Sequence, residues 1–212
     1  MDKRTELFDE AGDSLGRFDW VICTAPNAQA VELTADSGFA RQADILKPKM
    51  LACYSLMLGW DNESSLPDTL RDQKNPNWDV GYVKDSLLDR IFVEHQKPAH
   101  DALLPSVTIH ARNDWSEAHV DDDIETVKAQ LILAAQLLLK WDMESAPSQI
   151  DCHRWRYAAT DIDAQSKKNN DVLGILMDEQ HRWIVSGDWC GQGNIESCFQ
   201  MAQETVEAIV SR

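Results

Sequence analysis

The chain has 212 residues, of which 43% are hydrophobic and eight are tryptophan, so it can bury a sizeable core and is not a disordered protein. Its formal net charge of −16 argues against binding to nucleic acid or to anionic membrane surfaces, because both need clusters of Lys and Arg. The longest apolar stretch, residues 131–139, contains Gln136 and is about half of the ~20 residues that a membrane-spanning helix needs.

The start of the chain and its cysteines indicate a cytoplasmic protein. Residues 1–6 lack the apolar core of a signal peptide. The five cysteines are odd in number and share no close spacing, which argues against a disulfide framework. Cys23, Cys53 and Cys198 lie in apolar segments and are expected to be buried thiols.

The first third of the chain predicts two buried strands. Residues 1–17 are polar and are expected to be loose. Residues 18–26 form a short apolar run closed by proline, which is typical of a buried strand in a parallel sheet. A short helix should follow over residues 27–33 with Asn27 as its N-cap, and residues 51–59 predict the second buried strand.

The middle of the chain predicts more strands and the clearest helix. Residues 61–77 are expected to form a loop, and strands are expected near residues 80–83, 91–95 and 106–111. Asp121 can cap the helix that follows, which residues 145–147 end. Its apolar face repeats at Ile124, Val127, Leu131, Leu138 and Trp141.

The last quarter predicts a strand, a hairpin and a helix. Residues 152–158 favour a strand, and residues 161–170 a charged loop. Residues 172–177 and 183–186 favour a hairpin around residues 178–181. The final helix should place its apolar residues on one side: Ile195, Cys198, Phe199, Ala202, Val206, Ile209 and Val210.

These elements predict an α+β fold with α/β-like ends. Its middle should be a mixed, largely antiparallel sheet with helices, because several neighbouring strands are expected to pair antiparallel. Both ends of the chain have the character of a nucleotide-binding layer. The middle domain, residues 38–170, is therefore expected to be inserted between residues 1–37 and residues 171–212.

Residues 186–197 are the most informative segment. They predict the end of a buried strand, a glycine-rich turn with one carboxylate, and the start of an amphipathic helix, an arrangement typical of a nucleotide or flavin site. Glycines let the backbone approach a ligand closely. The G-x-G-x-x-G turn that opens a dinucleotide-binding fold does not occur upstream, so the chain resembles the back half of a two-part site.

Several segments, in chain order, carry a resemblance to a known family. They are residues 18–26, 85–88 with 96–98, 109–116, 153–158 (His-Arg-Trp-Arg-Tyr-Ala) and 187–190 (Gly-Asp-Trp-Cys), the last two being the most specific. Together they resemble the renalase-like branch of the FAD-dependent amine-oxidase-type flavoproteins. Such enzymes combine a Rossmann-like FAD domain with a substrate domain, and renalase-like members oxidise dihydronicotinamide compounds through FAD to oxygen.

The resemblance implies a role for each segment, although it identifies no catalytic residue. Residues 1–37 would end the FAD-binding layer, residues 38–170 would form the substrate domain, and residues 171–212 would contact FAD. The residues that it implies as cofactor-binding lie in the glycine turn, at the start of the last helix and at the end of the strand at residues 18–26. They are Gly187, Asp188, Trp189, Gly193, Asn194, Ile195, Ala25 and Pro26. Trp155 and Trp189 would contact a small-molecule substrate.

The chain departs from this family in two respects. The front third, with the glycine-rich turn, is missing, and Gln200 and Met201 replace small residues of the last helix. The chain alone is therefore expected to bind FAD weakly or not at all, and to be able to self-associate through the face that the missing domain would cover.

Other interpretations stay open at this point. The turn at residues 187–193 could be only a tight connection between strand and helix, and Asp188 could simply cap the helix. Trp155 and Trp189 could both be core residues. His153 lies beside Cys152 and Asp151, but neighbouring strand positions point to opposite faces, so no metal site is expected. His110 and His119 are expected to be structural. A non-catalytic binding domain derived from the family is the main alternative function.

Overall fold

The computed structural model describes residues 4–71, 78–99, 103–161 and 173–211, and it divides the chain into two compact units. Unit 1 comprises residues 1–50 and 159–212, and unit 2 comprises residues 51–158. The inserted unit is thus shorter than the domain expected over residues 38–170. The predicted charged loop at residues 161–170 lies outside the described residues from position 162 onward.

Unit 1 begins with a hairpin of β1 (Thr5–Phe8) and β2 (Ser14–Phe18), which pair antiparallel. The prediction that residues 1–17 are loose is therefore wrong over the described part. The Asp9 carboxylate accepts hydrogen bonds from two backbone N–H groups of the turn, and Gly12 adopts a φ of 86°. The β1–β2 hairpin is largely exposed, so its sequence lacks the apolar pattern of a buried strand. Local hydrogen bonds in the turn hold it together instead.

A second sheet in unit 1 contains β3 (Val21–Cys23), β10 (Trp183–Val185) and β9 (Leu176–Asp178), in that order. β3 pairs with β10 in parallel, and β10 pairs with β9 antiparallel. The predicted hairpin is confirmed, and the predicted parallel strand is confirmed over Val21–Cys23 only, because Phe18 at its expected start belongs to β2. β3 is, however, only half-buried. No described strand pairs with its outer edge, and its Ile22 side chain is 47% exposed.

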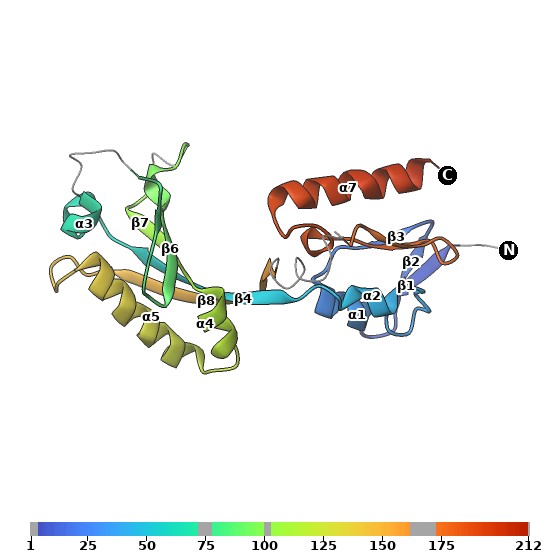
Figure 1. Cartoon of the computed structure of the whole chain (residues 1–212), viewed down its shortest axis with the longest axis horizontal. Helices are drawn as coiled ribbons and strands as arrows, with labels where there is room; N and C mark the ends of the chain where they lie inside the picture. Colours follow the sequence, from blue (N-terminus) through green and yellow to red (C-terminus); the bar gives the residue numbers. More distant parts are fainter. Residues whose placement is uncertain (1–3, 72–77, 100–102, 162–172, 212) are drawn as a thin grey trace. The chain divides into compact units, whose positions relative to one another are not determined.

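Helices lie on both faces of this sheet. Figure 1 shows α7 (Ile195–Val210) on one side of the strands, and α1 (Asn27–Thr34) and α2 (Gln42–Ile45) on the other. A one-turn helix, η3 (Asp188–Cys190), connects β10 to α7. The buried core of the unit consists of Ala30, Phe39, Ile45, Leu176, Trp183, Val185, Trp189, Cys190 and Met201.

Asn27 is the first residue of α1 rather than its N-cap, so that prediction is wrong. Pro26 occupies the cap position and makes no side-chain cap bond. The Asn27 amide instead donates to the Pro48 carbonyl at 2.6 Å, and its oxygen accepts from the Ala28 N–H at 2.8 Å. The buried amide thus ties the start of α1 to the segment that precedes unit 2.

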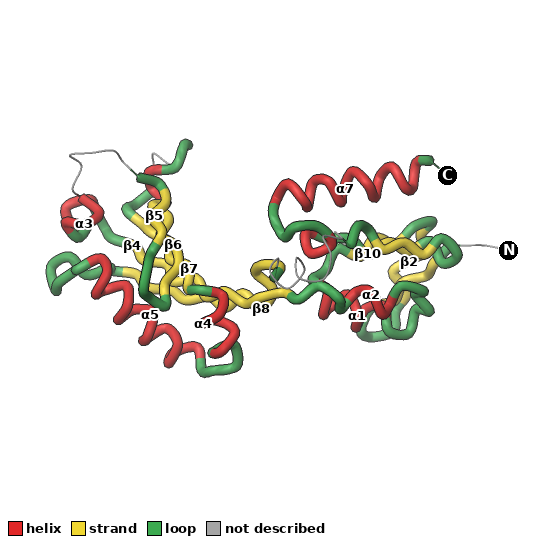
Figure 2. Tube along the Cα trace, viewed as in Figure 1, coloured by secondary structure: helices red, strands yellow, loops and turns green. Residues whose placement is uncertain are grey.

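Unit 2 is built on a five-stranded sheet with the order β5-β6-β7-β4-β8. Its strands are drawn in yellow in Figure 2. β5 pairs with β6, β6 with β7 and β7 with β4, all antiparallel. Hydrogen bonds from Ser148 to Gly59 and from Asp161 to Lys49 join opposite ends of β4 and β8, so these strands also run antiparallel. The strands are β4 (Met50–Gly59), β5 (Val80–Tyr82), β6 (Leu88–Val93), β7 (Ser106–Ala111) and β8 (Gln149–Thr160).

The expected α+β class is confirmed by these mixed helices and largely antiparallel sheets. Every strand predicted in the middle of the chain is found, within a few residues of its predicted bounds. The predicted loop at residues 61–77 contains short helical turns in its described part. The turns of this unit are η1 (Glu63–Ser65), α3 (Asp68–Arg71) and η2 (Glu94–Gln96).

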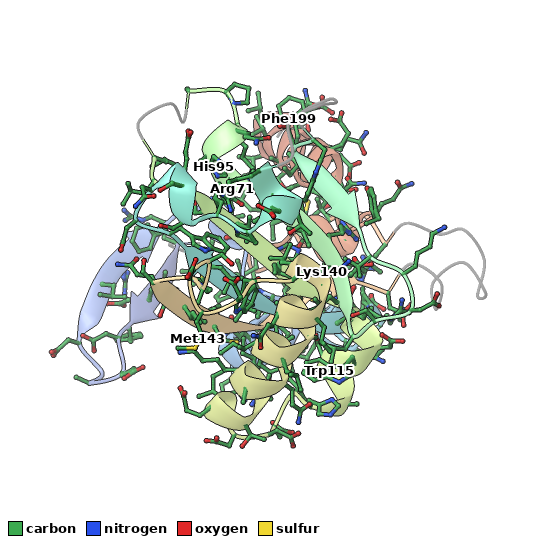
Figure 3. All side chains as sticks on the ribbon, turned by 90° about the vertical axis from the view of Figure 1, so that its left-hand side faces the viewer. Arg71, His95, Trp115, Lys140, Met143 and Phe199 are labelled. Carbon is green, nitrogen blue, oxygen red and sulfur yellow. The ribbon has the colours of Figure 1, made fainter. Side chains whose placement is uncertain are left out.

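Two helices, α4 (Asn113–Ala118) and α5 (Ile124–Leu139), pack on one face of the sheet. Asp123, and not Asp121, is the N-cap of α5, because its carboxylate accepts from the Thr126 N–H at 3.0 Å. The Asp121 carboxylate instead pairs with Arg156. The helix ends earlier than predicted, at Leu139, where Lys140 takes a left-handed conformation (Figure 3).

Neither a membrane-spanning helix nor a disulfide is found among the described residues. Within the described ranges, no helix is long and apolar enough to cross a membrane. All five cysteines are free, and Cys53 and Cys190 are buried. Cys23 is only half-buried and Cys198 is exposed, both against expectation; Cys198 lies on a side of α7 that does not face the sheet.

A buried carboxylate joins the two segments of unit 1. Asp178, at the end of β9, accepts hydrogen bonds from the Ala40 N–H at 2.9 Å and from His181 Nδ1 at 2.8 Å. Burial alone raises the pKa of the Asp178 carboxyl, but hydrogen bonds from His181 and Ala40 outweigh it, so the pKa lies below its ordinary value. The carboxylate therefore stabilises the fold in its charged form.

The substitution Asp178→Asn should lower the free energy of unfolding at neutral pH by about 1–3 kcal/mol. The folded-state pKa lies below the unfolded value of about 3.9, so the contribution is complete above that value and is lost as the pH falls through the folded pKa. Urea unfolding of both proteins at neutral and acidic pH should show the difference closing below about pH 4. Asp36→Asn, at an exposed carboxylate, is the control; a difference for Asp178→Asn that persists in acid would contradict this role.

Candidate functional site

The candidate site lies at the carboxyl ends of the two parallel strands of unit 1. Ala25 and Pro26 follow β3, and Gly187 and Asp188 follow β10. Because parallel strands end at the same edge of a sheet, the two segments meet there. The Trp189 indole N–H donates to the Ala25 carbonyl at 3.1 Å and fastens them together. In open α/β sheets this edge is where ligands bind.

Both long helices of unit 1 that follow these strands begin at this edge. α1 begins at Asn27 directly after Pro26, and α7 begins at Ile195 a few residues after the glycine turn. Asn194 caps α7, since its side-chain oxygen accepts from the Ser197 N–H at 2.8 Å. Among the described residues, no acceptor is found for the backbone N–H groups of Ile195 and Glu196. Free N–H groups at the positive end of a helix favour an anionic or electron-rich group.

The glycines of the turn are required by contacts within the chain itself. A Cβ atom on Gly187 would lie 2.7 Å from the Trp189 indole nitrogen. Gly193 has a φ of 69°, and its Cβ would lie 2.6 Å from Thr160, whose buried hydroxyl has no hydrogen-bond partner. The glycine pattern is therefore explained by close packing of the turn, and the evidence for a ligand comes from the strand ends and helix N-termini.

The side chains that were expected at the cofactor have different surroundings. Asp188 is half-buried, and its carboxylate accepts from the Trp189 N–H at 2.9 Å. Ile195 is 90% exposed, while Trp189 is 1% exposed and forms part of the core. Trp189 thus positions Ala25 and has no free surface for a substrate in this structure. Burial raises the pKa of the neighbouring Cys190 thiol to about 12, so it is protonated and unreactive at neutral pH.

The other expected substrate residue, Trp155, lies in unit 2 on the face of the sheet that the helices do not cover. It is 54% exposed, and its ring meets the edge of the His153 ring with centroids 4.4 Å apart. The neighbouring positions Ile150 and Cys152 pack into the core, so alternation along β8 places His153, Trp155 and Tyr157 on the outer face. Trp155 is therefore a surface residue and not a core residue.

Further aromatic side chains on this outer face were not identified from the sequence. The registers Ser55↔His110, Arg90↔His110 and Tyr82↔Arg90 place these residues on one face across four strands. The outer face includes Tyr82, Phe92, His110, Met57, Trp155 and Tyr157. The alternation of side chains along each strand would have identified this outer face, but only with the pairing of the strands known.

Ring contacts and charges shape this outer face. The His110 ring packs on Phe92 with centroids 4.8 Å apart, and Arg90 lies 5.8 Å from the centre of the Tyr82 ring. Burial, followed by the charge of Arg90, lowers the pKa of His110, so its imidazole is neutral at pH 7. His119, by contrast, is structural as expected, because its ring stacks on that of Trp115 (labelled in Figure 3), with centroids 4.3 Å apart.

Comparison with known proteins identifies the fold. No family model matches the chain. Among solved structures, a protein assigned as a protoporphyrinogen oxidase from Exiguobacterium sp. 255-15 superposes with a TM-score of 0.67 at 16% identity, over 99% of this chain and 44% of that one. UDP-galactopyranose mutase matches 98% of this chain and 44% of its own with a TM-score of 0.61 at 12% identity. Putrescine oxidase with bound putrescine matches 94% and 45%, with a TM-score of 0.60 at 11% identity.

These likenesses establish two points. The chain shares its fold with part of these enzymes, two of which are oxidases, although identities this low carry the fold and not the activity. The renalase-like assignment stays a prediction. The chain also spans less than half the length of the solved structures that it matches. The assignments of cofactor and substrate residues stay predictions.

The packing at the turn yields a stability prediction. Gly193→Ala should lower the free energy of unfolding by about 2–5 kcal/mol, because it adds a clash with Thr160 to the cost of a left-handed alanine. Gly12→Ala is the matched control: its φ is 86° and no atom lies within 4 Å of the added Cβ, so it should cost only about 1–2 kcal/mol. Urea unfolding measures both, and equal losses would show that Gly193 does not pack as described.

Proposed function

We propose that this chain forms the substrate-side and C-terminal part of a flavin-dependent oxidoreductase of the amine-oxidase type. The observation that carries the proposal is the fold: nearly the whole chain superposes on oxidases, and it covers less than half of them. On this proposal, unit 1 contains the end of a Rossmann-like FAD domain, and unit 2 is the substrate domain.

The residues at the carboxyl edge of unit 1 suit FAD. Gly187 and Asp188 would hold the ribityl region, with the Asp188 carboxylate available to accept from sugar hydroxyls. Ala25 and Pro26 would border the cofactor from the end of β3. The unpartnered N–H groups of α7 would favour the negative charge of a reduced flavin by about 0.3–1 kcal/mol, and more if buried.

Bound FAD would supply the redox chemistry, and the chain would supply position and electrostatics. A renalase-like substrate, dihydronicotinamide or amine, would then use the exposed aromatic face of unit 2. Trp155, Tyr157 and Tyr82 offer ring surfaces there, which suit a flat, uncharged ring better than a cation because Arg90 lies on the same face. We place the protein in the reducing cytoplasm, where its five free thiols are stable.

A second candidate is a non-catalytic binding domain that retains this fold. The exposed apolar side chains of α7 favour it, because they provide a docking surface without a cofactor. The two candidates differ in whether a polypeptide that contains this chain holds FAD in stoichiometric amount.

The chain by itself should bind FAD weakly, since it covers less than half of the fold that these oxidases use. Titration of the purified 212-residue chain into FAD, followed by flavin fluorescence and calorimetry, measures the affinity. A tight, stoichiometric flavin in the isolated chain would show that the missing part of the fold is not needed.

In the polypeptide that carries the complete fold, Asp188→Ala should weaken FAD binding by about 10–100-fold, the loss of a hydrogen bond to a charged group. The melting temperature of the apoprotein should change little. Asp13→Ala, on the β1–β2 turn, serves as the control and should leave flavin content unchanged. If the apoprotein melts much earlier while each folded molecule keeps its flavin, the cofactor role of Asp188 is wrong.

A further inference from the structure

The helix α5 of unit 2 turns one side to the sheet. Its buried residues are Val127, Leu131, Ala135 and Leu139, which are spaced four apart, as expected for one face of a helix. All four belong to the core of unit 2. The opposite side of α5 therefore takes no part in the packing that holds the helix on its sheet.

This opposite side, which we call the solvent side of α5, is largely apolar and uncharged. Its residues lie about 140–260° around the helix from Leu131 and are all exposed: Thr126, Ala129, Gln130, Leu133, Gln136, Leu137 and Lys140. The Leu133 and Leu137 side chains are 59% and 72% exposed. Surface helices normally carry polar and charged residues on this side, so two leucines one turn apart mark an interaction surface.

The solvent side of α5 lies in a stretch of the chain without acidic residues. Although 36 of the 212 residues are Asp or Glu, residues 126–141 contain none of them, and their charged residues are Lys128 and Lys140. The net charge of −16 therefore resides elsewhere, and two copies of the chain that met through most other surfaces would repel each other. A contact of α5 with α5 keeps carboxylates out of its centre.

The two ends of the solvent side are complementary in charge. Glu125 lies in the first turn of α5, and Lys140, labelled in Figure 3, lies at its C-terminal end. Neither side chain forms an ion pair with a residue that the structure describes. The carboxylate of Asp142, which follows, is already bound by the N–H groups of Glu144 and Ser145. Two antiparallel α5 helices would place each Lys140 beside the Glu125 of the other copy and align their dipoles favourably.

This pairing also gives the leucines self-complementary positions. With Lys140 beside Glu125 of the second copy, the two-fold axis passes close to Leu133, which then meets its own mate. Leu137 lies over Ala129 of the second copy, and this match of a large with a small side chain lets helix axes approach to about 8–10 Å.

A lipid surface fits the solvent side of α5 less well. Helices that lie on membranes carry a strongly basic polar face, whereas α5 contains Lys128 alone and is followed by Lys140. The net charge of −16 also opposes approach to an anionic membrane. The apolar centre and the paired charges favour a second copy of the chain instead.

We propose that two copies of this chain associate through the solvent side of α5, with the helices antiparallel around a two-fold axis close to Leu133. The inference goes beyond the proposed function and does not depend on FAD, because all of its residues lie in unit 2. A contact along one helix of this length is small for a protein interface, so the dimer should dissociate on dilution.

Sedimentation velocity of the purified protein over a wide range of concentration tests the proposal. Leu133→Glu and Leu133→Lys each place two like charges on the axis. Leu104→Glu is the matched control, because Leu104 is a 64% exposed leucine of unit 2 outside α5. Phe199→Glu tests the exposed apolar side of α7 as a competing surface. All these positions are exposed, so the melting temperatures should stay unchanged.

We expect a dimer whose dissociation constant rises about 100-fold or more for either Leu133 variant alone, since each loses two buried leucines and adds repulsion. An equimolar mixture of the two Leu133 variants should dimerise again, because a Glu then meets a Lys on the axis. Leu104→Glu and Phe199→Glu should leave the dissociation constant unchanged.

A zero-length crosslinker that joins amines to carboxylates checks the orientation of the helices. Lys140 and Glu125 lie about 22 Å apart on one helix, so a link between them can form only between copies. We expect this link in the dimer, identified by mass spectrometry. A monomer at every concentration, a dimer that withstands Leu133→Glu or is lost equally with Phe199→Glu, a mixture that stays monomeric, or a dimer without this link would each overturn the proposal.

Discussion

The parallel pairing of β3 with β10 is the interaction on which the rest of unit 1 depends. The two strands come from opposite ends of the chain, with the whole of unit 2 between them. Their pairing aligns the segments that follow each strand, so that Ala25 and the Gly187–Asp188 turn meet and the indole of Trp189 can bond across them. Without this register, the two helix N-termini would not share an edge, and no candidate cofactor site would exist.

Unit 2 meets a simpler constraint. Its antiparallel sheet has one face buried under α4 and α5, so apolar residues must alternate with others along each strand. What is unusual is the outer face, where aromatic and basic side chains replace the polar residues that water would favour.

Local patterns in the sequence were sufficient to predict most elements. The apolar run before Pro26, the alternation at residues 106–111 and the periodicity after Asp123 each reflect one strand or one helix, and each is found. The errors concern choices between neighbours: Asp123 caps α5 although Asp121 is equally acidic, because only its carboxylate reaches the Thr126 N–H. The β1–β2 hairpin was missed because its stability comes from turn hydrogen bonds and not from an apolar pattern.

The candidate site could be predicted only in part, because its residues act through long-range contacts. The glycine turn was evident from the sequence, but the reason for Gly193 is the position of Thr160, which no local pattern reveals. The sequence left open whether Trp189 contacts a ligand or lies in the core; it lies in the core, and its indole bonds to Ala25, far away in the sequence. The apolar flank of α7 was recognised as a stripe, while its exposure depends on how Met201 fixes the helix.

The interrupted course of unit 1 has a consequence for how the protein is made. Unit 2 is one continuous segment and can fold as soon as it has been synthesised, whereas β3 must wait for β10, the last strand of the chain. Closing so long a loop is costly in chain entropy, and the cost falls if its interior has already condensed. The entry and exit strands of unit 2, β4 and β8, are neighbours in its sheet, so early folding of unit 2 brings the two halves of unit 1 to nearby starting points. The order of synthesis and the order of folding would then coincide, because the folded unit 2 would hold the two segments of unit 1 close together.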